Sequence, residues 1–214
     1  MNFYSKLTSG YEDYLIRLIF GSKVEADPLS VCLDTAYLDF NRTLRGISKV
    51  ENGAKLHTDA VDVLSNSLSE LKEVLKTPTD QTTFDDWHED TCAKLISVYD
   101  GSYTVYAGQA QKWVNMTLKY VYTLGERISG FEAAYPLCHA PLDKVVVGEL
   151  AKFGFPRLTR VWSQLDYAEY FERQKWIRNK FILVPLDVEF LLWLRKPIEV
   201  KHVRLSTQPT ATPV

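Results

Sequence analysis

The sequence predicts an all-α fold, and three observations carry this prediction. Apolar residues recur at spacings of three and four along most of the chain, whereas the strict alternation typical of a strand is nearly absent. Proline and aspartate stand where helices should begin, and glycine stands where they should end. Hydrophobic residues make up 46% of the 214 residues, so the chain can bury a substantial core. We expect a compact single-domain array of helices, with a two-lobed arrangement around a central helix–hairpin–helix as the alternative.

The first two expected helices show the signals most clearly. Residues 28–46 follow Asp27, a helix-capping residue, begin with Pro28 and end at Gly46. Residues 54–76 carry an apolar stripe at helical spacing, formed by Val61, Leu64, Leu68, Leu71 and Leu75.

Five further helices are expected in the rest of the chain. Their boundaries follow from turn residues, such as Gly125 after one segment and Pro197 after another. The expected ranges are 83–99, 104–124, 141–153, 164–181 and 186–195.

The sequence lacks the signals of a membrane-spanning segment and of a secretory leader. No apolar run approaches the roughly 20 residues that span a bilayer. Glu12, Asp13 and Arg17 interrupt the N-terminal apolar residues, which is unlike a secretory leader. We therefore expect a cytoplasmic protein that binds no membrane, with residues 1–204 as one domain and residues 205–214, rich in proline and threonine, as a disordered tail.

Charge is unevenly distributed along the chain. Residues 1–100 hold 10 basic and 17 acidic side chains, whereas residues 152–214 hold 11 basic and 6 acidic ones. One explanation is that a basic face meets a polyanion while an acidic face stays in solvent. The other is that the two halves attract each other inside one fold, and the sequence leaves both open.

The most informative motif is a G-x-A-x-K pattern formed by Gly108, Ala110 and Lys112, followed by Asp143 shortly after Pro141. This pattern resembles the helix–hairpin–helix DNA glycosylases, above all their 8-oxoguanine branch, over about 40 residues. In that family such a turn starts a buried helix, and an aspartate follows at the start of the next helix.

The resemblance implies a role for each matching residue. The backbone amide of Gly108 would hold a DNA phosphate at a helix N-terminus. Lys112 would attack C1′ of the sugar to form a Schiff base, and Asp143 would orient the lysine and stabilise positive charge on the sugar. The apolar neighbours Trp113 and Val114 would desolvate the lysine and favour its free amine. The alternative is that Lys112 lies on the surface of an ordinary amphipathic helix and that Asp143 only caps the next helix.

A second group of residues could bind a metal or line a pocket. His88 and Cys92 are four apart on an expected helix, so they share a face, and Cys138 and His139 complete a His/Cys set. Adjacent Cys138 and His139 chelate one ion only with strain, and the three cysteines form neither a C-x-x-C pair nor a disulfide framework. We expect no metal and no cofactor, and we assign His88 and Asp90 to a ligand pocket.

Aromatic and basic residues alternate in the C-terminal third of the chain. Trp162 lies among Arg157, Arg160 and Arg178, a combination that suits unstacked bases and phosphates. At helical spacing, the same combination is also typical of a core with a solvated rim.

The resemblance to the glycosylases, together with these residues, implies a DNA-binding base-excision glycosylase and lyase that uses Lys112 and Asp143, or a catalytically altered relative. The alternative function is a non-enzymatic helical component of a bacterial or phage conflict system that binds a protein partner. DNA and a protein are thus the two expected partners.

Overall fold

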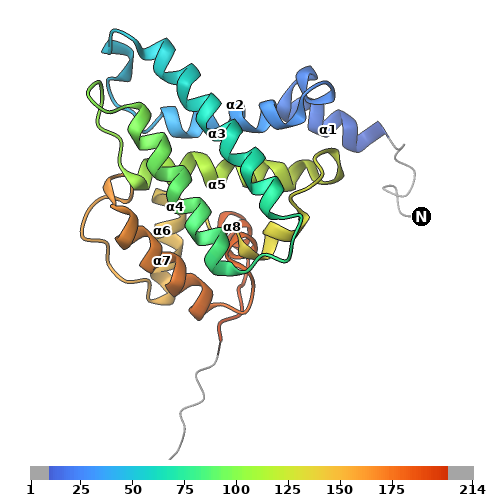
Figure 1. Cartoon of the computed structure of the whole chain (residues 1–214). Helices are drawn as coiled ribbons and strands as arrows, with labels where there is room; N and C mark the ends of the chain where they lie inside the picture. The colour runs from blue at the N-terminus through green and yellow to red at the C-terminus, as the bar shows by residue number, and fades with distance from the viewer. Residues whose placement is uncertain (1–9, 202–214) are drawn as a thin grey trace, which may run out of the picture.

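In the computed structural model, which describes residues 10–201, the helices pack around one buried helix, α5 (Figure 1). Within these residues there is no sheet, and the single β-bridge joins Phe181 to Val200. The all-α prediction is confirmed, while the tail expected at 205–214 lies outside the described residues. The α-helices are α1 (Gly10–Phe20), α2 (Pro28–Asn41), α3 (Gly53–Val74), α4 (Gln81–Val98), α5 (Ala107–Leu124), α6 (Lys144–Leu150), α7 (Tyr167–Lys180) and α8 (Pro185–Trp193).

All seven expected helices are present, with shifted ends, and one further helix was not expected. Helix α2 ends at Asn41 and not at Gly46, whose positive φ belongs to the turn that follows. Helix α1 was missed, although Tyr11, Tyr14, Leu18 and Ile19 recur at helical spacing. These four side chains face solvent, so the apolar stripe of α1 does not pack on the core.

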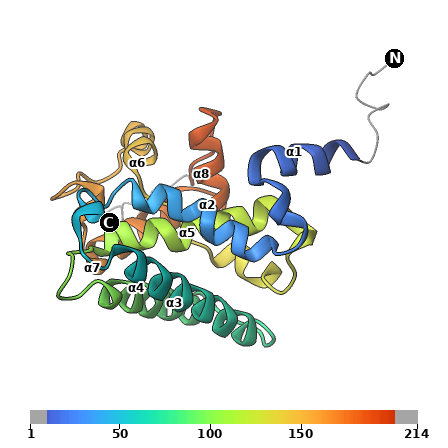
Figure 2. The same cartoon turned by 90° about the horizontal axis from the view of Figure 1, so that it is seen from above.

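Every residue of α5 from 107 to 118 is buried. Helix α2 packs along it, where the Trp113 ring stacks on Phe40 at 5.0 Å and its indole N–H donates to the Leu33 carbonyl at 3.1 Å. Helices α3 and α4 cover one side of α5, while α6 and α8 lie on the other (Figure 2). The fold is therefore layered, and the middle layer is α5 with α2.

Four helices begin on an aspartate whose carboxylate accepts a hydrogen bond from a backbone N–H in the first turn. Aspartate is among the best residues at this position because the first turn leaves backbone N–H groups without helical partners. The capping residues are Asp27 of α2, Asp80 of α4, Asp143 of α6 and Asp166 of α7.

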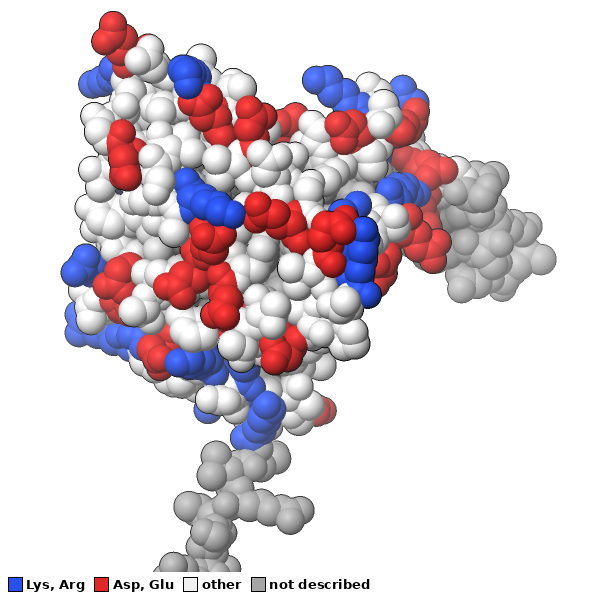
Figure 3. All heavy atoms as spheres, in the orientation of Figure 1, with Lys and Arg blue, Asp and Glu red and all other residues white. Residues whose placement is uncertain are grey.

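The two sides of the molecule differ in charge. Residues 53–98, which include α3 and α4, carry 9 acidic and 4 basic side chains. Figure 3 shows acidic side chains across the middle of the face on which α3 and α4 lie.

Across residues 10–201, the structure contains no helix that is both long enough and apolar enough to cross a membrane.

The packing of Trp113 gives a direct test of the layered core. Trp113→Ala removes a fully buried ring and leaves a cavity between α2 and α5, so we expect the free energy of unfolding to fall by about 3–5 kcal/mol. The matched control is Trp193→Ala at the exposed end of α8, which should change it by no more than about 0.5 kcal/mol. Urea denaturation of both variants measures the difference, and an equal decrease in both would contradict this description of the core.

Candidate functional site

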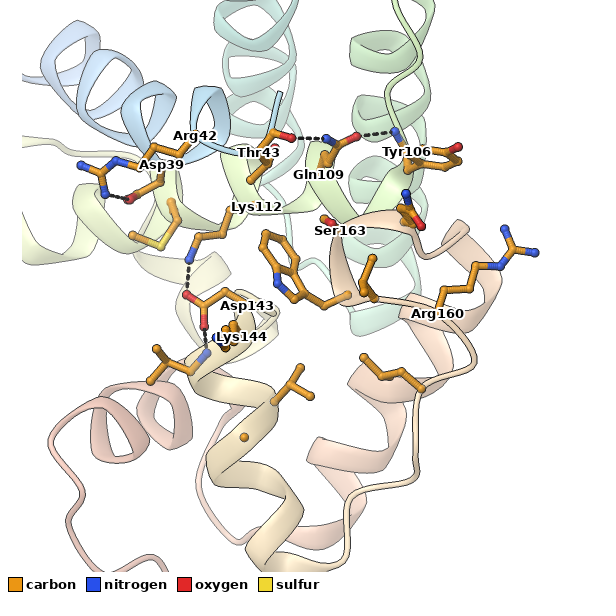
Figure 4. Close-up of a pocket in the computed structure, with 18 of the residues that line it drawn as sticks. Asp39, Arg42, Thr43, Tyr106, Gln109, Lys112, Asp143, Lys144, Arg160 and Ser163 are labelled. Atoms are coloured by element: carbon orange, nitrogen blue, oxygen red, sulfur yellow. Dashed lines mark hydrogen bonds and ion pairs between the residues drawn. The ribbon is translucent and has the colours of Figure 1, made fainter. Parts of the chain in front are cut away.

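A groove of about 1460 Å³ crosses the molecule on the side of α5 that faces α6. The end of α2, one face of α5, helix α6 and the loop at 155–164 form its walls. Figure 4 shows the groove with Lys112 pointing from α5 to Asp143, and Arg160 across from them on the loop.

Lys112 and Asp143 form an ion pair in this groove. Lys112 Nζ donates to Asp143 Oδ2 at 2.7 Å, and only 7% and 13% of the two side chains are exposed. The other carboxylate oxygen accepts from the backbone N–H groups of Val145 and Val146, both at 2.9 Å. Asp143 thus caps α6, as the alternative interpretation expected, but the expected surface position of Lys112 is wrong because α5 is buried there.

A second ion pair lies one heptad further along α5, on the same face as Lys112. Lys119 Nζ donates to Glu189 Oε1 of α8 at 2.8 Å, and the Glu189 side chain is completely buried. Burial raises the pKa of Glu189 above its ordinary value, although the charges of Lys119 and Lys112 act to lower it. The two pairs tie α6 and α8 to the central helix.

The rim of the groove is positively charged. The ends of four exposed side chains reach solvent there, and none of them has a carboxylate within 4 Å among residues 10–201. They come from three different segments of the chain. The four residues are Arg45 after α2, Lys144 at the start of α6, and Arg157 and Arg160 on the loop between α6 and α7.

Gly108 lies in the first turn of α5 and not in an open turn between helices, so its predicted role is wrong. Its backbone N–H donates to the carbonyl of Leu165 at 3.0 Å, and the residue is buried. The amide is therefore not free to hold a phosphate. Gly108 instead allows the loop that carries Trp162 to lie directly against α5.

The structure brings five of the predicted site residues to the groove: Lys112, Asp143, Trp162, Arg157 and Arg160.

Three other predicted site residues lie elsewhere, so their assignment to this site is wrong. His88 is completely buried on the inner face of α4, and Asp90, two residues later, points to solvent and pairs with Lys94. Arg178 of α7 forms two hydrogen bonds with the carboxylate of Asp85, at 3.0 and 3.3 Å, and a third with the Leu137 carbonyl.

His88 belongs to a buried polar network that joins α4, α5 and α7. The network also includes Asp85, Asn115, His139 and Tyr170. His139 Nε2 lies 2.7 Å from Asp85 Oδ1, and Tyr170 Oη lies 2.8 Å from both His139 Nδ1 and Asn115 Nδ2. The side-chain amide oxygen of Asn115, Oδ1, lies 3.0 Å from His88 Nε2.

This arrangement is consistent with two neutral histidines. A carboxylate and an amide oxygen only accept, so Nε2 carries the proton in both His139 and His88. Burial lowers the pKa of His139 to about 4 and that of His88 well below its ordinary value. Burial alone would raise the pKa of Asp85, but hydrogen bonds from His139 and Gln81 and the charge of Arg178 hold it below its usual range.

The His/Cys set does not form a metal site, although Cys92 Sγ lies 3.8 Å from His88 Nδ1 and the His88 and His139 rings are 4.3 Å apart. Both ring nitrogens of His88 and of His139 have protein hydrogen-bond partners, and Cys138 lies 3.7 Å from the Tyr122 hydroxyl. Within the described part of the chain, no three His, Cys, Asp or Glu side chains are arranged to hold a metal ion.

Comparison with protein-family models, with curated proteins and with solved structures yields no match. The function of the groove is therefore argued from its own geometry and charge.

Sequence analysis missed several residues of the groove. Lys119 could have been found, because it lies seven residues after Lys112 and so shares its face of α5. Arg45 could not have been found, because its place on the rim depends on how α2 packs against α5.

The histidine network predicts that stability depends on pH. Below about pH 6.5 the unfolded chain binds a proton at His139, whereas the folded chain binds it only near pH 4. Stability should therefore fall on acidification across this window, by up to about 3 kcal/mol for His139, and His88 adds a decrease of the same sign. Urea denaturation at pH 7 and pH 4.5 measures it. His139→Gln should reduce the difference, and an unchanged difference in that variant would contradict the assignment.

Proposed function

We propose that this chain binds DNA in the groove and acts as a base-excision glycosylase and lyase through Lys112 and Asp143. The observation that carries the proposal is the 2.7 Å Lys112–Asp143 pair in a groove whose rim carries four cations with no carboxylate within 4 Å among residues 10–201. Lysine and aspartate come from segments 31 residues apart, and they meet because Asp143 caps α6 directly against α5.

The pair supplies the groups that this chemistry needs. Nζ of Lys112 would pass a proton to Asp143 and form a bond to C1′ of the sugar. The bond from C1′ to the base would break, and the base would leave with its electron pair and take a proton from water. The resulting covalent intermediate opens to a Schiff base. The low exposure of Lys112 excludes much of the bulk water, so the sugar has to reach deep into the groove.

Charge supports DNA as the ligand. Phosphate oxygens bind arginine and lysine, and Arg157, Arg160, Lys144 and Arg45 have no competing carboxylate within 4 Å in residues 10–201. The acidic residues concentrate over α3 and α4 on the other side of α5, so a polyanion approaching the molecule is directed to the groove. In this proposal the four rim cations bind the DNA phosphates, which Gly108 was expected to do.

The lyase step is tested by borohydride trapping. Borohydride should reduce the Schiff base and leave a covalent adduct with DNA that contains an abasic or oxidised site, and Lys112→Gln should abolish the adduct. Lys94→Gln, on α4 where Lys94 pairs with Asp90 and Glu70, is the matched control and should retain it. Circular dichroism checks that both variants fold. Absence of an adduct on every lesion tested with the wild-type chain would rule out the lyase step.

Salt dependence tests the rim. Each phosphate that is neutralised releases about 0.9 counterion, so the logarithm of affinity should fall linearly with the logarithm of salt concentration. Arg157→Ala with Arg160→Ala should flatten that slope by about one unit for each phosphate that the variant no longer neutralises. Arg178→Ala is the contrasting variant. Because Arg178 pairs with Asp85, its replacement should lower the melting temperature and leave the slope unchanged. Fluorescence anisotropy between roughly 50 and 300 mM salt, the range in which counterion release changes affinity strongly, measures the slopes.

One outcome favours the alternative function. If the wild-type chain binds no DNA even at low salt, the charge asymmetry acts only within the fold. A non-enzymatic protein that binds a protein partner then becomes the better explanation, and the exposed apolar side chains of α1 favour it.

A further inference from the structure

The loop that carries Trp162 lies unusually close to α5, and Gly108 is the reason. A Cβ atom at position 108 would lie 2.0 Å from the Trp162 carbonyl oxygen and 3.0 Å from the carbonyl carbon of Ser163. Both contacts are with backbone atoms, so a side chain at 108 could fit only if the loop moved. The hydrogen bond from Gly108 N–H to Leu165 O holds the loop in this position.

The Trp162 side chain lines the groove and is partly exposed. Among residues 10–201 it has no aromatic or cationic partner within ring-contact distance, whereas Trp193 at the other side of the groove has Lys119 Nζ 5.7 Å from its ring. Arg160, on the same loop, is exposed and has no carboxylate within 4 Å in that part of the chain. An indole face beside unpaired cations is the combination that binds bases and phosphates of an unpaired strand.

The size of the groove also indicates an extended ligand. Pockets for small molecules enclose about 300–1,000 Å³, whereas this groove encloses about 1460 Å³. Base stacking on a tryptophan requires a base whose face has left the duplex stack. A paired duplex would present phosphates to the rim but no base face to Trp162.

We propose that the groove binds an unpaired DNA strand and that one base stacks on the Trp162 ring, which serves as a stacking platform. Gly108 is the positioning residue, because it allows the loop that carries this platform to lie against α5. The inference rests on the proposed function for the identity of the ligand. It adds that the DNA strand is unpaired and that one of its bases contacts Trp162. Gly108 touches no ligand and acts only through the position of the loop.

Binding of a labelled oligonucleotide tests the platform. The probe is one mixed-sequence strand, used alone and annealed to its complement, with fluorescence anisotropy at low salt as the measurement. The wild-type chain should bind the single strand at least about 10-fold more tightly than the duplex. Trp162→Ala should weaken single-strand binding by about 10-fold or more, since stacking on an aromatic side chain contributes that much per base. Duplex binding should stay unchanged, and Trp162→Phe, which keeps a ring face, should restore most of the single-strand affinity.

Two glycines test the positioning role. Gly108→Ala should weaken single-strand binding as Trp162→Ala does, whereas Gly53→Ala at the start of α3, outside the groove, where an added Cβ would lie 3.4 Å from the Ile47 carbonyl oxygen, should not. Quenching of tryptophan emission by the single strand gives a second readout, which should be strong in the wild-type chain and reduced in both Trp162→Phe and Gly108→Ala. If Gly108→Ala fails to fold, the two Trp162 variants still decide the question of the platform.

The possible failures are distinguishable. Equal binding of both strand forms, unaffected by Trp162→Ala, would overturn this inference and leave the proposed function standing. No binding of either form by the wild-type chain would overturn the proposed function and this inference with it.

Discussion

The structure depends on the burial of α5, a helix whose polar side chains must all find partners without water. Between Ala107 and Leu118 every residue of the helix is buried, yet four of them are Gln109, Gln111, Lys112 and Asn115. An unpaired polar group in such a place costs about 1–3 kcal/mol, and an unpaired charge costs more. Gln111 therefore bonds to both backbone groups of Leu142, and Lys112 bonds to Asp143. These bonds join the segments around α5 to it, in addition to the apolar packing.

The groove follows from this requirement. Asp143 serves two purposes, because one of its oxygens caps α6 and the other neutralises Lys112, so the start of α6 cannot move away from α5. On the opposite wall, Gly108 permits the close approach of the Trp162 loop. The groove is thus bounded by two contacts with the same helix.

The sequence predicted the helices well because their signals are local. Asp27, Pro28 and the stripe of 54–76 each act within a few residues. It also paired Lys112 with Asp143 correctly in space, through the resemblance to the glycosylases. It misplaced His88, Gly108 and Arg178 because the partners that bury them are distant in the chain. Arg178, for example, meets Asp85 from a position 93 residues away. A basic side chain beside aromatic residues looks the same in sequence whether it faces a ligand or a buried carboxylate.

The central claim is that DNA lies in the groove between α5, α6 and the Trp162 loop. Mapping of backbone amide shifts by nuclear magnetic resonance, during titration with a short oligonucleotide, tests it most directly. The account predicts the largest changes at Lys144, Arg157, Arg160 and Trp162, with little change along α3 and α4. Changes centred on the exposed basic residues of α7, such as Lys175, or changes absent from the groove, would contradict it.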